Sequence, residues 1–387
     1  MTTDWDAIVI GAGPAGSVAA RQLALSGRRV LLLDKKRFPR RKVCGACLNH
    51  SAVMLLEQIG LADILPKNRD SELTGFDLRS GSRRLSLPLP SGRAISRTVL
   101  DQKLVDAAIR AGVTFQDGVN ATVGPCDVVG TRTVSVNDSS ATSTLTAKVV
   151  LAADGLGHPS LCDISEIQDQ SARSSRIGAG CEVTEFPTEY VPGVIHMAVG
   201  RGGYVGLVRV ESGALNIAAA FDARLVRDSN GPAGAATNVL HHAGFPAIPA
   251  MAEAEWLGTP ALTRSTMPVA AERLFVLGDA SGYVEPFTGE GIGWALASAV
   301  AVAPLASTAC DPPAAEQPSL ANAWSREHSR LVRRRQRTCR ILAALLKSPT
   351  CVRLAMFLLP KMPRLLQPII RGVSLPTPQS LAITRCG

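Results

Sequence analysis

The sequence lacks the features of several protein classes. Its nine cysteines are odd in number and scattered over 387 residues, which is typical of a reducing cytosol rather than of a disulfide framework. Only Cys44 and Cys47 stand close together, and no second pair lies at ligand spacing from them, so we expect no metal site. The apolar runs are shorter than a membrane-spanning helix, and Met1 to Asp4 has neither the basic start nor the cleavage region of a signal peptide. We therefore expect a cytoplasmic protein.

Acidic residues are scarce in one part of the chain. Charged residues make up 19% of the sequence and hydrophobic ones 46%, which is typical of a globular protein, and the formal net charge is +9. Between Arg326 and Arg353, nine Lys or Arg stand against a single acid, Glu327. The basic excess therefore belongs to one C-terminal segment, and we expect no nucleic-acid partner.

The first strand leads into a glycine-rich turn. Apolar residues Ala7 to Ile10 precede Gly11-Ala12-Gly13-Pro14-Ala15-Gly16, and a helix is predicted from Ser17 to Leu25. This G-x-G-x-x-G pattern is typical of dinucleotide-binding proteins: the first glycine allows the turn, the second lets the backbone approach a pyrophosphate, and the third lets the helix pack on the sheet. The free amides at the helix start face the phosphates. A second strand, Arg29 to Leu33, ends at Asp34, which we expect to bind a ribose hydroxyl.

A cationic segment follows the second strand. It holds six Lys or Arg from Lys35 to Lys42, and we expect Lys35 and Arg41 to neutralise the pyrophosphate. The small residues of Cys44-Gly45-Ala46-Cys47 let the backbone pass close to a planar ring, so Cys44 and Gly45 are predicted cofactor contacts. The C-x-x-C spacing leaves a dithiol redox pair as the alternative.

Further strands and helices belong to the same first domain. Arg97 stands before a helix predicted from Gln102 to Ala111, from where it can reach the pyrophosphate. Thr131 to Val136 and Thr142 to Ala147 are predicted to form an antiparallel hairpin, and a separate buried parallel strand is predicted from Lys148 to Ala152. Asp154 follows in a loop.

The pattern changes from Arg176 to Phe221, where strands of period two alternate with glycine turns. This predicts a second, sheet-containing domain inserted in the first. Its residues His196, Met197 and Tyr204 are candidates to face a substrate, with core packing as the alternative role of each.

A strand from Arg273 to Leu277 then ends in Gly278-Asp279, and an Ala-rich helix is predicted from Trp294 to Ala303. Asp279 can bond a ribitol hydroxyl. The amides of Gly291 to Gly293 can hold a negative ring edge, because a helix N-terminus favours anions. These residues predict a second dinucleotide contact.

The C-terminal part is predicted to form a helix from Ala321 to Leu346 and an apolar-basic stretch from Val352 to Arg371. Five arginines recur at steps of three and four and so share one broad helix face: Arg330, Arg333, Arg334, Arg337 and Arg340. We predict that this face is solvated. Contact with a membrane surface is the alternative, because apolar residues follow.

Together these motifs resemble the FAD-dependent monooxygenase superfamily, the para-hydroxybenzoate hydroxylase-like enzymes, nearest its branch of geranylgeranyl reductases and flavin-dependent halogenases. The matching residues run in the family's order: Gly11 to Gly16 with Asp34, Phe38-Pro39-Arg40, Lys42-Val43-Cys44-Gly45, Arg97 with Asp101, Ala153-Asp154-Gly155, and Gly278-Asp279 to Pro286-Phe287-Thr288-Gly289-Glu290-Gly291-Ile292. The resemblance implies that the glycine turn and the Gly278-Asp279 motif contact FAD, and that Asp154-Gly155 lies near the pyrophosphate. The implied flavin-facing candidates are Cys44, Pro286, Gly289, Gly291 and Ile292, with Phe287 as a substrate contact.

The implied fold is α/β. A Rossmann-type (GR2-like) FAD-binding domain would comprise residues 1–75, 95–170 and 272–310. An inserted antiparallel-sheet substrate domain would comprise residues 76–94 and 171–271, and a helical, basic-apolar region residues 311–387.

The resemblance also implies an FAD-dependent oxidoreductase. We expect an NAD(P)H-dependent monooxygenase that hydroxylates an apolar or aromatic, secondary-metabolite-like substrate through a flavin hydroperoxide, with NAD(P)H binding only transiently because a single dinucleotide fold is visible. The Trp-x-Trp-x-Ile-Pro motif of halogenases is absent, which disfavours halogenation.

Two alternatives remain. Tyr204-Val205-Gly206-Leu207-Val208-Arg209 stands in place of the aromatic-x-Trp-x-Phe-Pro strand of isoprenoid reductases, but Cys44-Gly45 and Pro286 to Ile292 fit that group. Reduction of isoprenoid or lipid double bonds is therefore the second hypothesis. The third is a flavoprotein that docks an acidic protein, such as a carrier protein, through its arginine helix; the protein would otherwise be peripheral to a membrane.

Overall fold

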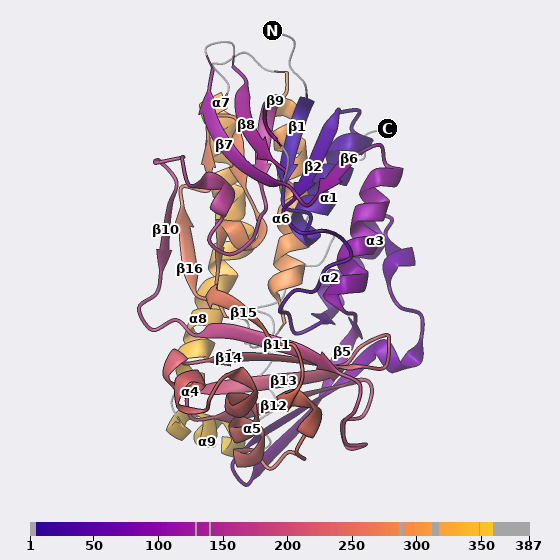
Figure 1. Ribbon diagram of the computed structural model, residues 1–387, viewed down its shortest axis with the longest axis vertical. Helices are drawn as coiled ribbons and strands as arrows, with labels where there is room; N and C mark the ends of the chain where they lie inside the picture. Colours follow the sequence, from indigo (N-terminus) through magenta and orange to yellow (C-terminus); the bar gives the residue numbers. More distant parts are fainter. Residues whose placement is uncertain are drawn as a thin grey trace.

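The computed structural model describes residues 5–127, 130–138, 141–285, 289–311, 317–347 and 349–358. Two large sheets form most of the molecule (Figure 1). The first lies in the upper half of the view and the second crosses the lower half, while the C-terminal helices run along one side from the first sheet to the second.

The first sheet has a parallel core in the order β18-β9-β1-β2-β6. Its strands are β1 (Trp5–Ile10), β2 (Val30–Asp34), β6 (Thr114–Asp117), β9 (Thr142–Ala152) and β18 (Leu274–Val276). A short strand, β17 (Ala270–Ala271), pairs antiparallel with β18. The central strands are runs of aliphatic residues buried on both faces, as parallel sheets require.

Alternate residues of β1 pack on opposite sides of this sheet. Ala7 and Val9 contact the helix layer, whereas Ile8 and Ile10 belong to the core on the other face. The helices are α1 (Pro14–Leu25), α3 (Arg97–Arg110) and α6 (Gly291–Ala309), and the opposite layer contains β7 (Asn120–Cys126) and β8 (Arg132–Asn137). The carboxyl ends of β1 and β2 lie beside the start of α1, and the loops of the candidate site follow from them.

Strand β9 corrects the predicted split at Ala147. The first part of the strand pairs antiparallel with β8 and its last residues pair parallel with β1, without a break between them. The two patterns differ because the strand begins with exposed residues, Thr142 to Thr144, and ends in residues that are buried on both faces.

Helix α6 also differs from its prediction. It has nineteen residues rather than the ten from Trp294 to Ala303, because the helix begins at Gly291 and continues past an internal proline, Pro304. By length and apolarity it is the one helix in the described ranges that could cross a membrane, contrary to the expectation from the sequence. In this fold 67% of its eighteen-residue apolar window is buried, chiefly against α1 and α7 (Gln317–His328), so packing accounts for its composition.

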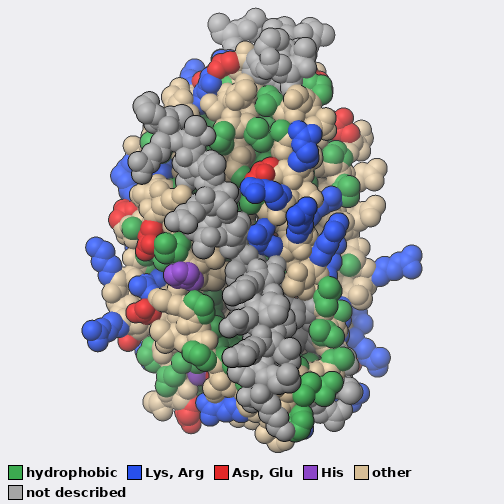
Figure 2. All heavy atoms as spheres, turned by 180° about the vertical axis from the view of Figure 1, so that it is seen from behind, with side chains coloured by type: hydrophobic (Ala, Val, Ile, Leu, Met, Phe, Trp, Pro, Cys, Tyr) green, Lys and Arg blue, Asp and Glu red, His purple; other side chains and the backbone are tan. Residues whose placement is uncertain are grey.

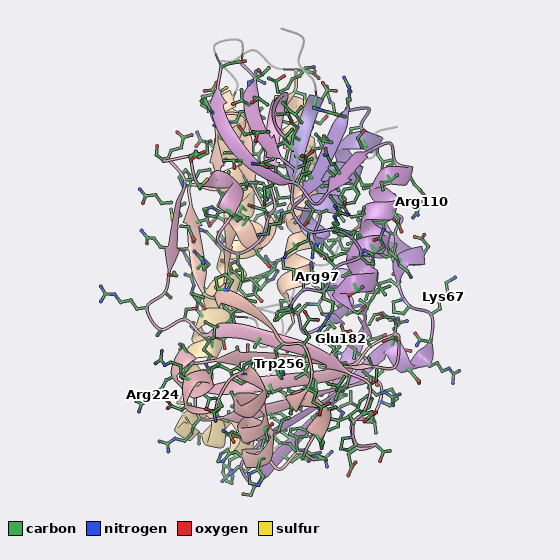
Figure 3. All side chains as sticks on the ribbon, viewed as in Figure 1. Lys67, Arg97, Arg110, Glu182, Arg224 and Trp256 are labelled. Atoms are coloured by element: carbon green, nitrogen blue, oxygen red, sulfur yellow. The ribbon has the colours of Figure 1, made fainter. Side chains whose placement is uncertain are left out.

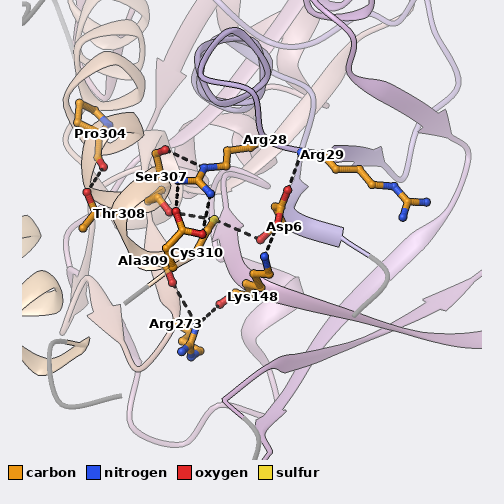
Figure 4. Close-up of polar contacts among 12 residues, drawn as sticks. Asp6, Arg28, Arg29, Lys148, Arg273, Pro304, Ser307, Thr308, Ala309 and Cys310 are labelled. Carbon is orange, nitrogen blue, oxygen red and sulfur yellow. Dashed lines mark hydrogen bonds and ion pairs between the residues drawn. The ribbon is translucent and has the colours of Figure 1, made fainter. Parts of the chain in front are cut away.

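Polar contacts join the C-terminal end of α6 to the amino-terminal edge of the sheet (Figure 4). Arg28 Nε donates to Ser307 Oγ over 3.0 Å, and Lys148 Nζ lies 2.7 Å from Asp6 Oδ1. Arg273 Nη1 donates to the Ala309 carbonyl over 3.1 Å. These contacts lie at the opposite end of β1 from the glycine turn and serve the fold.

The second sheet has eight strands in the order β15-β11-β14-β13-β12-β4-β5-β3. They are β15 (Leu257–Ala261), β11 (Ile177–Val183), β14 (Leu215–Phe221), β13 (Gly203–Arg209), β12 (Val194–Gly200), β4 (Glu72–Ser80), β5 (Arg83–Ala94) and β3 (Cys47–Leu48). All neighbours are antiparallel except β12 and β4. The predicted boundary at residue 76 falls inside β4, which as a whole belongs to this sheet.

Two helices, α4 (Ala223–Asp228) and α5 (Pro232–His242), lie on the outer side of the second sheet, where α5 covers a core of Val205, Ile217 and Val239. A small three-stranded sheet, β10 (Gln168–Ser171), β16 (Arg264–Met267) and β19 (Gly282–Tyr283), stands between the two large ones. Helix α2 (His50–Gln58) follows β3 and packs with α6.

The C-terminal region is not one helix from Ala321 to Leu346, as predicted. A π-helical turn, Ser329–Arg333, separates α7 from α8 (Arg334–Lys347), and α9 (Pro349–Leu358) follows. The rest of the predicted apolar-basic stretch, up to Arg371, lies outside the described residues.

Helices α7 and α8 are attached to the loop that follows β18. Trp324 Nε1 donates to the Val276 carbonyl over 3.1 Å, and Gln336 Nε2 donates to the Gly282 carbonyl over 2.9 Å. Between them, His328 Nε2 lies 2.8 Å from Ser281 Oγ, and burial lowers the pKa of this histidine to about 4. A neutral imidazole therefore fastens the π turn to the loop.

Candidate functional site

The three glycines of the first turn meet different demands. Gly11 has φ +101°, and a Cβ there would lie 2.4 Å from the Ala153 carbonyl oxygen; a Cβ on Gly16 would lie 1.8 Å from the Gly11 oxygen. Both positions need glycine for the fold itself. A Cβ on Gly13 would meet no described atom closer than 3.5 Å, at Arg97 Nη2. The space beside Gly13 is thus available for a ligand, as the motif predicts for a pyrophosphate.

Asp34 closes the end of β2 beside this turn. One carboxylate oxygen accepts from the Ala12 amide over 2.8 Å and the other from the Lys36 amide over 2.9 Å. The side chain is therefore held next to the glycine turn, where the motif places a ribose.

Two buried arginines face the space beside Gly13. Arg97 Nη2 lies 2.7 Å from Asp101 Oδ2, and Arg40 Nη1 lies 3.0 Å from the same oxygen, while Arg40 Nη2 lies 3.3 Å from Asp34. Asp101 is fully buried. Burial opposes the charge of Arg97, but Asp101 raises the pKa of this guanidinium above its ordinary value, so it stays charged. Arg40 Nε is buried and has no partner among the described residues.

These observations fit an anionic ligand. Two cations share one buried carboxylate, one nitrogen has no partner in the described ranges, and the backbone of Gly13 leaves room beside them. A pyrophosphate would supply the missing acceptors. Arg97 and the glycine turn are thus brought together as predicted, and Figure 3 shows Arg97 between the two sheets.

In the cationic segment, the side chains nearest the glycine turn differ from the two that the sequence analysis singled out. Arg40 and Lys42 lie on the side of the glycine turn, with Lys42 Nζ 3.1 Å from the position of a Cβ on Gly155. Burial lowers the pKa of Lys42, and the nearby Arg97 lowers it further. Of the two predicted cations, Lys35 is exposed and Arg41 is turned toward Glu255, 3.0 Å away. In an extended chain, side chains of successive residues point to opposite sides, so the sequence could have predicted that Arg40 and Lys42 face one side and Arg41 the other.

Asp154 lies in the loop that packs against Gly11 of the glycine turn. Its Oδ2 accepts from the Ser160 amide over 2.8 Å, and burial raises the pKa of its carboxyl. Because the Ala153 carbonyl and the Asp154 Cα pack directly on Gly11, this loop fixes the backbone of the glycine turn. The structure thus gives Asp154 a supporting position.

The second glycine motif reaches the same region from the other end of the chain. Gly278 has φ +61°, and a Cβ there would lie 2.8 Å from the Ala15 side chain in α1. The charge of the neighbouring Asp279 raises the pKa of both Lys42 and Arg97, which places the carboxylate among the cations of the first motif. Two motifs far apart in sequence therefore face one space.

Two loops that come together line the expected position of the ring. A Cβ on Gly289 would lie 3.6 Å from Cys47 Cβ, and Glu290, which precedes α6, accepts a hydrogen bond from Asn49 Nδ2. Burial raises the pKa of Glu290 to about 7, although Asn49 and Arg335 act to lower it. Gly291 and Ile292 form the start of α6, three residues before the predicted start at Trp294. Pro286 and Phe287 lie outside the described residues.

The C-x-x-C pair has the properties of packing residues. Both thiols are free, and Cys47 Sγ donates to the Gly45 carbonyl over 2.9 Å. Burial raises the pKa of Cys47 well above that of an ordinary thiol, which disfavours the thiolate that dithiol exchange needs. The Cys44 carbonyl accepts from Asn216 Nδ2 over 3.0 Å, so this loop also contacts the second sheet.

The three substrate candidates on the second sheet do not share one face. His196 lies on the outer side, where its ring is 5.4 Å from that of Tyr190 and its Nδ1 is 3.6 Å from Asp77. Met197 and Tyr204 lie on the inner side, in a buried apolar cluster with Val352 of α9. Alternation along β12 turns neighbouring side chains to opposite faces.

Tyr204 takes part in a buried polar network at the edge of this cluster. It hydrogen-bonds Glu285, and Arg176 Nη1 lies 3.0 Å from Glu285 Oε1. Burial first, and Glu285 second, raise the pKa of Tyr204 well above its ordinary value, and burial does the same for the nearby Tyr283. Glu285 stands directly before Pro286. Sequence reasoning missed this network because Tyr204 comes from β13, Glu285 from the loop after β19 and Arg176 from the loop before β11.

The second sheet is held against the first motif by polar contacts. Glu211 accepts from the Ser96 amide over 2.7 Å and from the Ser96 hydroxyl over 2.6 Å, at the start of α3. A small open pocket between the sheets is lined by Lys42, Cys44 and Arg97 on one side and by Glu182 and Asn216 on the other. In Figure 3, Arg97, at the start of α3, and Glu182, in β11, are labelled near each other where the two halves of the molecule meet.

Comparison with curated proteins gives partial matches. Conditioned medium factor receptor 1 of Dictyostelium discoideum is 28% identical over 328 residues, which is 76% of this chain and 61% of that protein. Menaquinone reductase of Mycobacterium tuberculosis is 35% identical over 161 residues, 40% of this chain and 38% of that protein. The chain thus matches less than two thirds of the length of either relative.

Among solved structures, p-nitrophenol 4-monooxygenase PnpA of Pseudomonas putida has a similar fold, with a TM-score of 0.76 and 14% identity over 96% of this chain and 97% of that one. The model of the FAD binding domain family matches residues 4–308. This match covers both glycine motifs, the buried arginines and the second sheet. The chain therefore belongs to the FAD binding domain family.

Proposed function

We propose that the protein reduces an extended apolar substrate that carries a ring oxygen, of the chemical class of a prenylated quinone. The observation that carries the proposal is the inner face of the second sheet. There, an apolar cluster that includes Leu78, Met197 and Met356 adjoins two protonated phenols, Tyr204 and Tyr283. The sequence match to a menaquinone reductase supports the same substrate class.

The residues of the chain would divide the work as follows. The adenosine and pyrophosphate end of FAD would bind at the glycine turn, Arg40 and Arg97, and the ring would lie near Cys44 and the start of α6. Bound FAD would supply the hydride chemistry. The apolar cluster would hold the substrate and keep water away from it.

The two tyrosines would act on the substrate oxygen. Because their pKa values are raised, both keep the phenolic proton at neutral pH. Tyr204 already donates to Glu285, whereas Tyr283 is only half-buried, which makes Tyr283 the better donor to an incoming oxygen. Arg176 Nη1 holds Glu285 in place, 3.0 Å from its Oε1.

Hydroxylation of an apolar or aromatic substrate is the second candidate, and strand β13 favours it. Its inward positions carry Tyr204 and Gly206, with Met197 Cε 3.2 Å from the position of a Cβ on Gly206. Tyr204 supplies the first aromatic residue of the strand that the resemblance associates with isoprenoid reductases, but Gly206 and Val208 stand in place of its Trp and Phe, and Met197 fills the space beside Gly206.

The mass of the product separates the two candidates. The FAD-loaded protein, reduced chemically without oxygen, is mixed with a short-chain prenylated naphthoquinone, and flavin absorbance and product mass are followed. Anaerobic flavin oxidation with a product heavier by two hydrogens supports reduction. A product heavier by one oxygen, formed only in air, supports hydroxylation, and no product under either condition contradicts both.

Matched tyrosine variants test the site. Tyr283→Phe should raise the substrate KM or slow flavin oxidation about fivefold, since one hydrogen bond to the substrate is worth roughly 1 kcal/mol. Tyr190→Phe is the control, because that buried phenol donates to the Pro246 carbonyl on the outer face of the sheet. Equal effects of the two variants would argue against a substrate contact at Tyr283.

A further inference from the structure

The last two described helices carry an unusual share of exposed apolar side chains. Four of the nine large exposed apolar residues in the described ranges lie there: Ile341 (64% exposed), Leu345 (48%), Leu354 (56%) and Phe357 (48%). Isolated residues of this kind are ordinary on a surface, but a group on consecutive helices marks a contact site.

Both helices have two distinct sides. In α8, Gln336 and Cys339 are buried, while Ile341 and Leu345, one turn apart, lie on the outer side. In α9, Val352 and Met356 pack with Met197 and Tyr204, while Leu354 and Phe357 point outward. The fold therefore uses one side of each helix and leaves the apolar residues of the other side exposed.

Uncompensated positive charge adjoins these residues. Arg334, Arg337, Arg340 and Lys347 are exposed, and the single acid of the segment, Glu327, is paired with Arg330 at 2.8 Å. Arg340 and Arg337 lower the pKa of Arg333, after burial, which reports mutual repulsion of the cations. On the right-hand side of Figure 2, Lys and Arg side chains gather above a group of hydrophobic ones.

We propose that the outer side of α8 and α9 binds an anionic lipid surface. The surface of a bilayer has a layer of anionic headgroups above a layer of acyl chains. The cations of α8 would contact the headgroups, and the neighbouring apolar side chains of α8 and α9 would enter the acyl-chain layer. The helix α6, although apolar enough to span a membrane, is buried in the fold and takes no part.

This position has a consequence for the substrate path. Helix α9 separates the apolar cluster around Met197 and Tyr204 from the proposed lipid layer by its own thickness only. An apolar substrate dissolved in the bilayer would thus have a short route to the cluster. Lipid binding itself requires no substrate, so it can be tested independently of the proposed reaction.

The test is co-sedimentation of the FAD-loaded full chain with vesicles. Vesicles of phosphatidylcholine alone are compared with vesicles that also contain phosphatidylglycerol, at low and at physiological salt. We expect binding to the anionic vesicles, and weaker binding as salt shortens the Debye length to about 8 Å. Absence of binding, or equal binding to both vesicles, would overturn the proposal.

Two double variants separate the contributions. Arg337→Glu with Arg340→Glu should lower the partition coefficient roughly thirtyfold or more, at about 1 kcal/mol for each basic residue near the surface. Leu354→Ser with Phe357→Ser should also lower it, whereas Leu25→Ser with Ile109→Ser, which removes exposed apolar residues from α1 and α3, should not. Flavin absorbance and circular dichroism verify that each variant is folded.

Insertion of the apolar residues has its own readout. The tryptophan emission of Phe357→Trp should shift to shorter wavelength on addition of anionic vesicles. If binding remains salt-dependent but neither this shift nor the Leu354/Phe357 effect occurs, the surface fits an acidic protein instead and the lipid proposal is wrong.

Discussion

The two ends of the candidate FAD site are built in different ways. At the glycine turn, the geometry is set by backbone: Gly11 and Gly16, both within one strand-helix-strand unit, allow contacts that any side chain would prevent, and Ala153, directly after β9, packs against them. At the expected ring position, side chains of α2, β3, α6 and α8 meet, as Asn49, Glu290 and Arg335 show. Local sequence therefore determines the first end, whereas tertiary packing determines the second.

The largest effect expected at the first end comes from removing its shared carboxylate. Asp101→Ala leaves Arg97 and Arg40 buried without their common partner, and breaking a buried pair in this way costs about 3–5 kcal/mol. Urea unfolding of the apoprotein measures it. The control is Asp228→Ala, which removes an exposed pair with Arg224 and should cost about 0.5 kcal/mol or less. Similar values for both would refute the picture of a buried charge centre.

Substitutions of two glycines in the turn should have different effects, one on the stability of the apoprotein and the other on FAD binding. Gly16→Ala places a Cβ on a backbone oxygen and should destabilise the apoprotein by about 3 kcal/mol or more. Gly13→Ala has ordinary contacts and should leave apoprotein stability nearly unchanged while lowering FAD occupancy. Thermal unfolding and flavin absorbance give the two readouts. Full FAD occupancy in Gly13→Ala would show that the cofactor does not approach this position.

The ring end should respond to pH through Glu290. In the folded protein its pKa is about 7, against 4.5 for the free side chain, so the folded state holds the proton between these values and the unfolded state does not. Stability should fall as pH rises from about 4.5 to 7, by about 3 kcal/mol. In Glu290→Gln this contribution should vanish. Unfolding curves measured across this range decide the matter, and an unchanged pH slope in the variant would contradict a raised pKa.

The smallest effect is expected where α9 covers the second sheet. Met356→Ala should cost about 2 kcal/mol and increase amide exchange in α9 before the rest of the chain. Leu354→Ala, on the exposed side of the same helix, is the control and should change neither. Equal exchange in both variants would mean that α9 does not depend on the apolar cluster.

The same contrast explains what could be predicted from the sequence. The glycine turn, Asp34, Arg97 and the Gly278-Asp279 motif were found because each depends on a few neighbouring residues. Within the predicted cationic run, Lys35 and Arg41 were singled out, whereas Arg40 and Lys42 lie beside the turn, because a run of cations does not reveal which side each faces. The bond from Asn49 to Glu290 and the Tyr204 network escaped prediction because their members are distant in sequence and carry no pattern. His196 and Met197, adjacent in sequence, lie on opposite faces once the strand is formed.

The π turn at Ser329–Arg333 makes the C-terminal surface depend on a single residue. An α-helix advances about 100° for each residue, so deletion of one residue from the turn would rotate everything after it by roughly that angle. Gln336 would then leave the Gly282 carbonyl, and Ile341 would turn away from its outward position. Insertion or loss of one codon in this turn would therefore change which side chains of the following helices are exposed, and relatives could differ in their C-terminal surface by this single step.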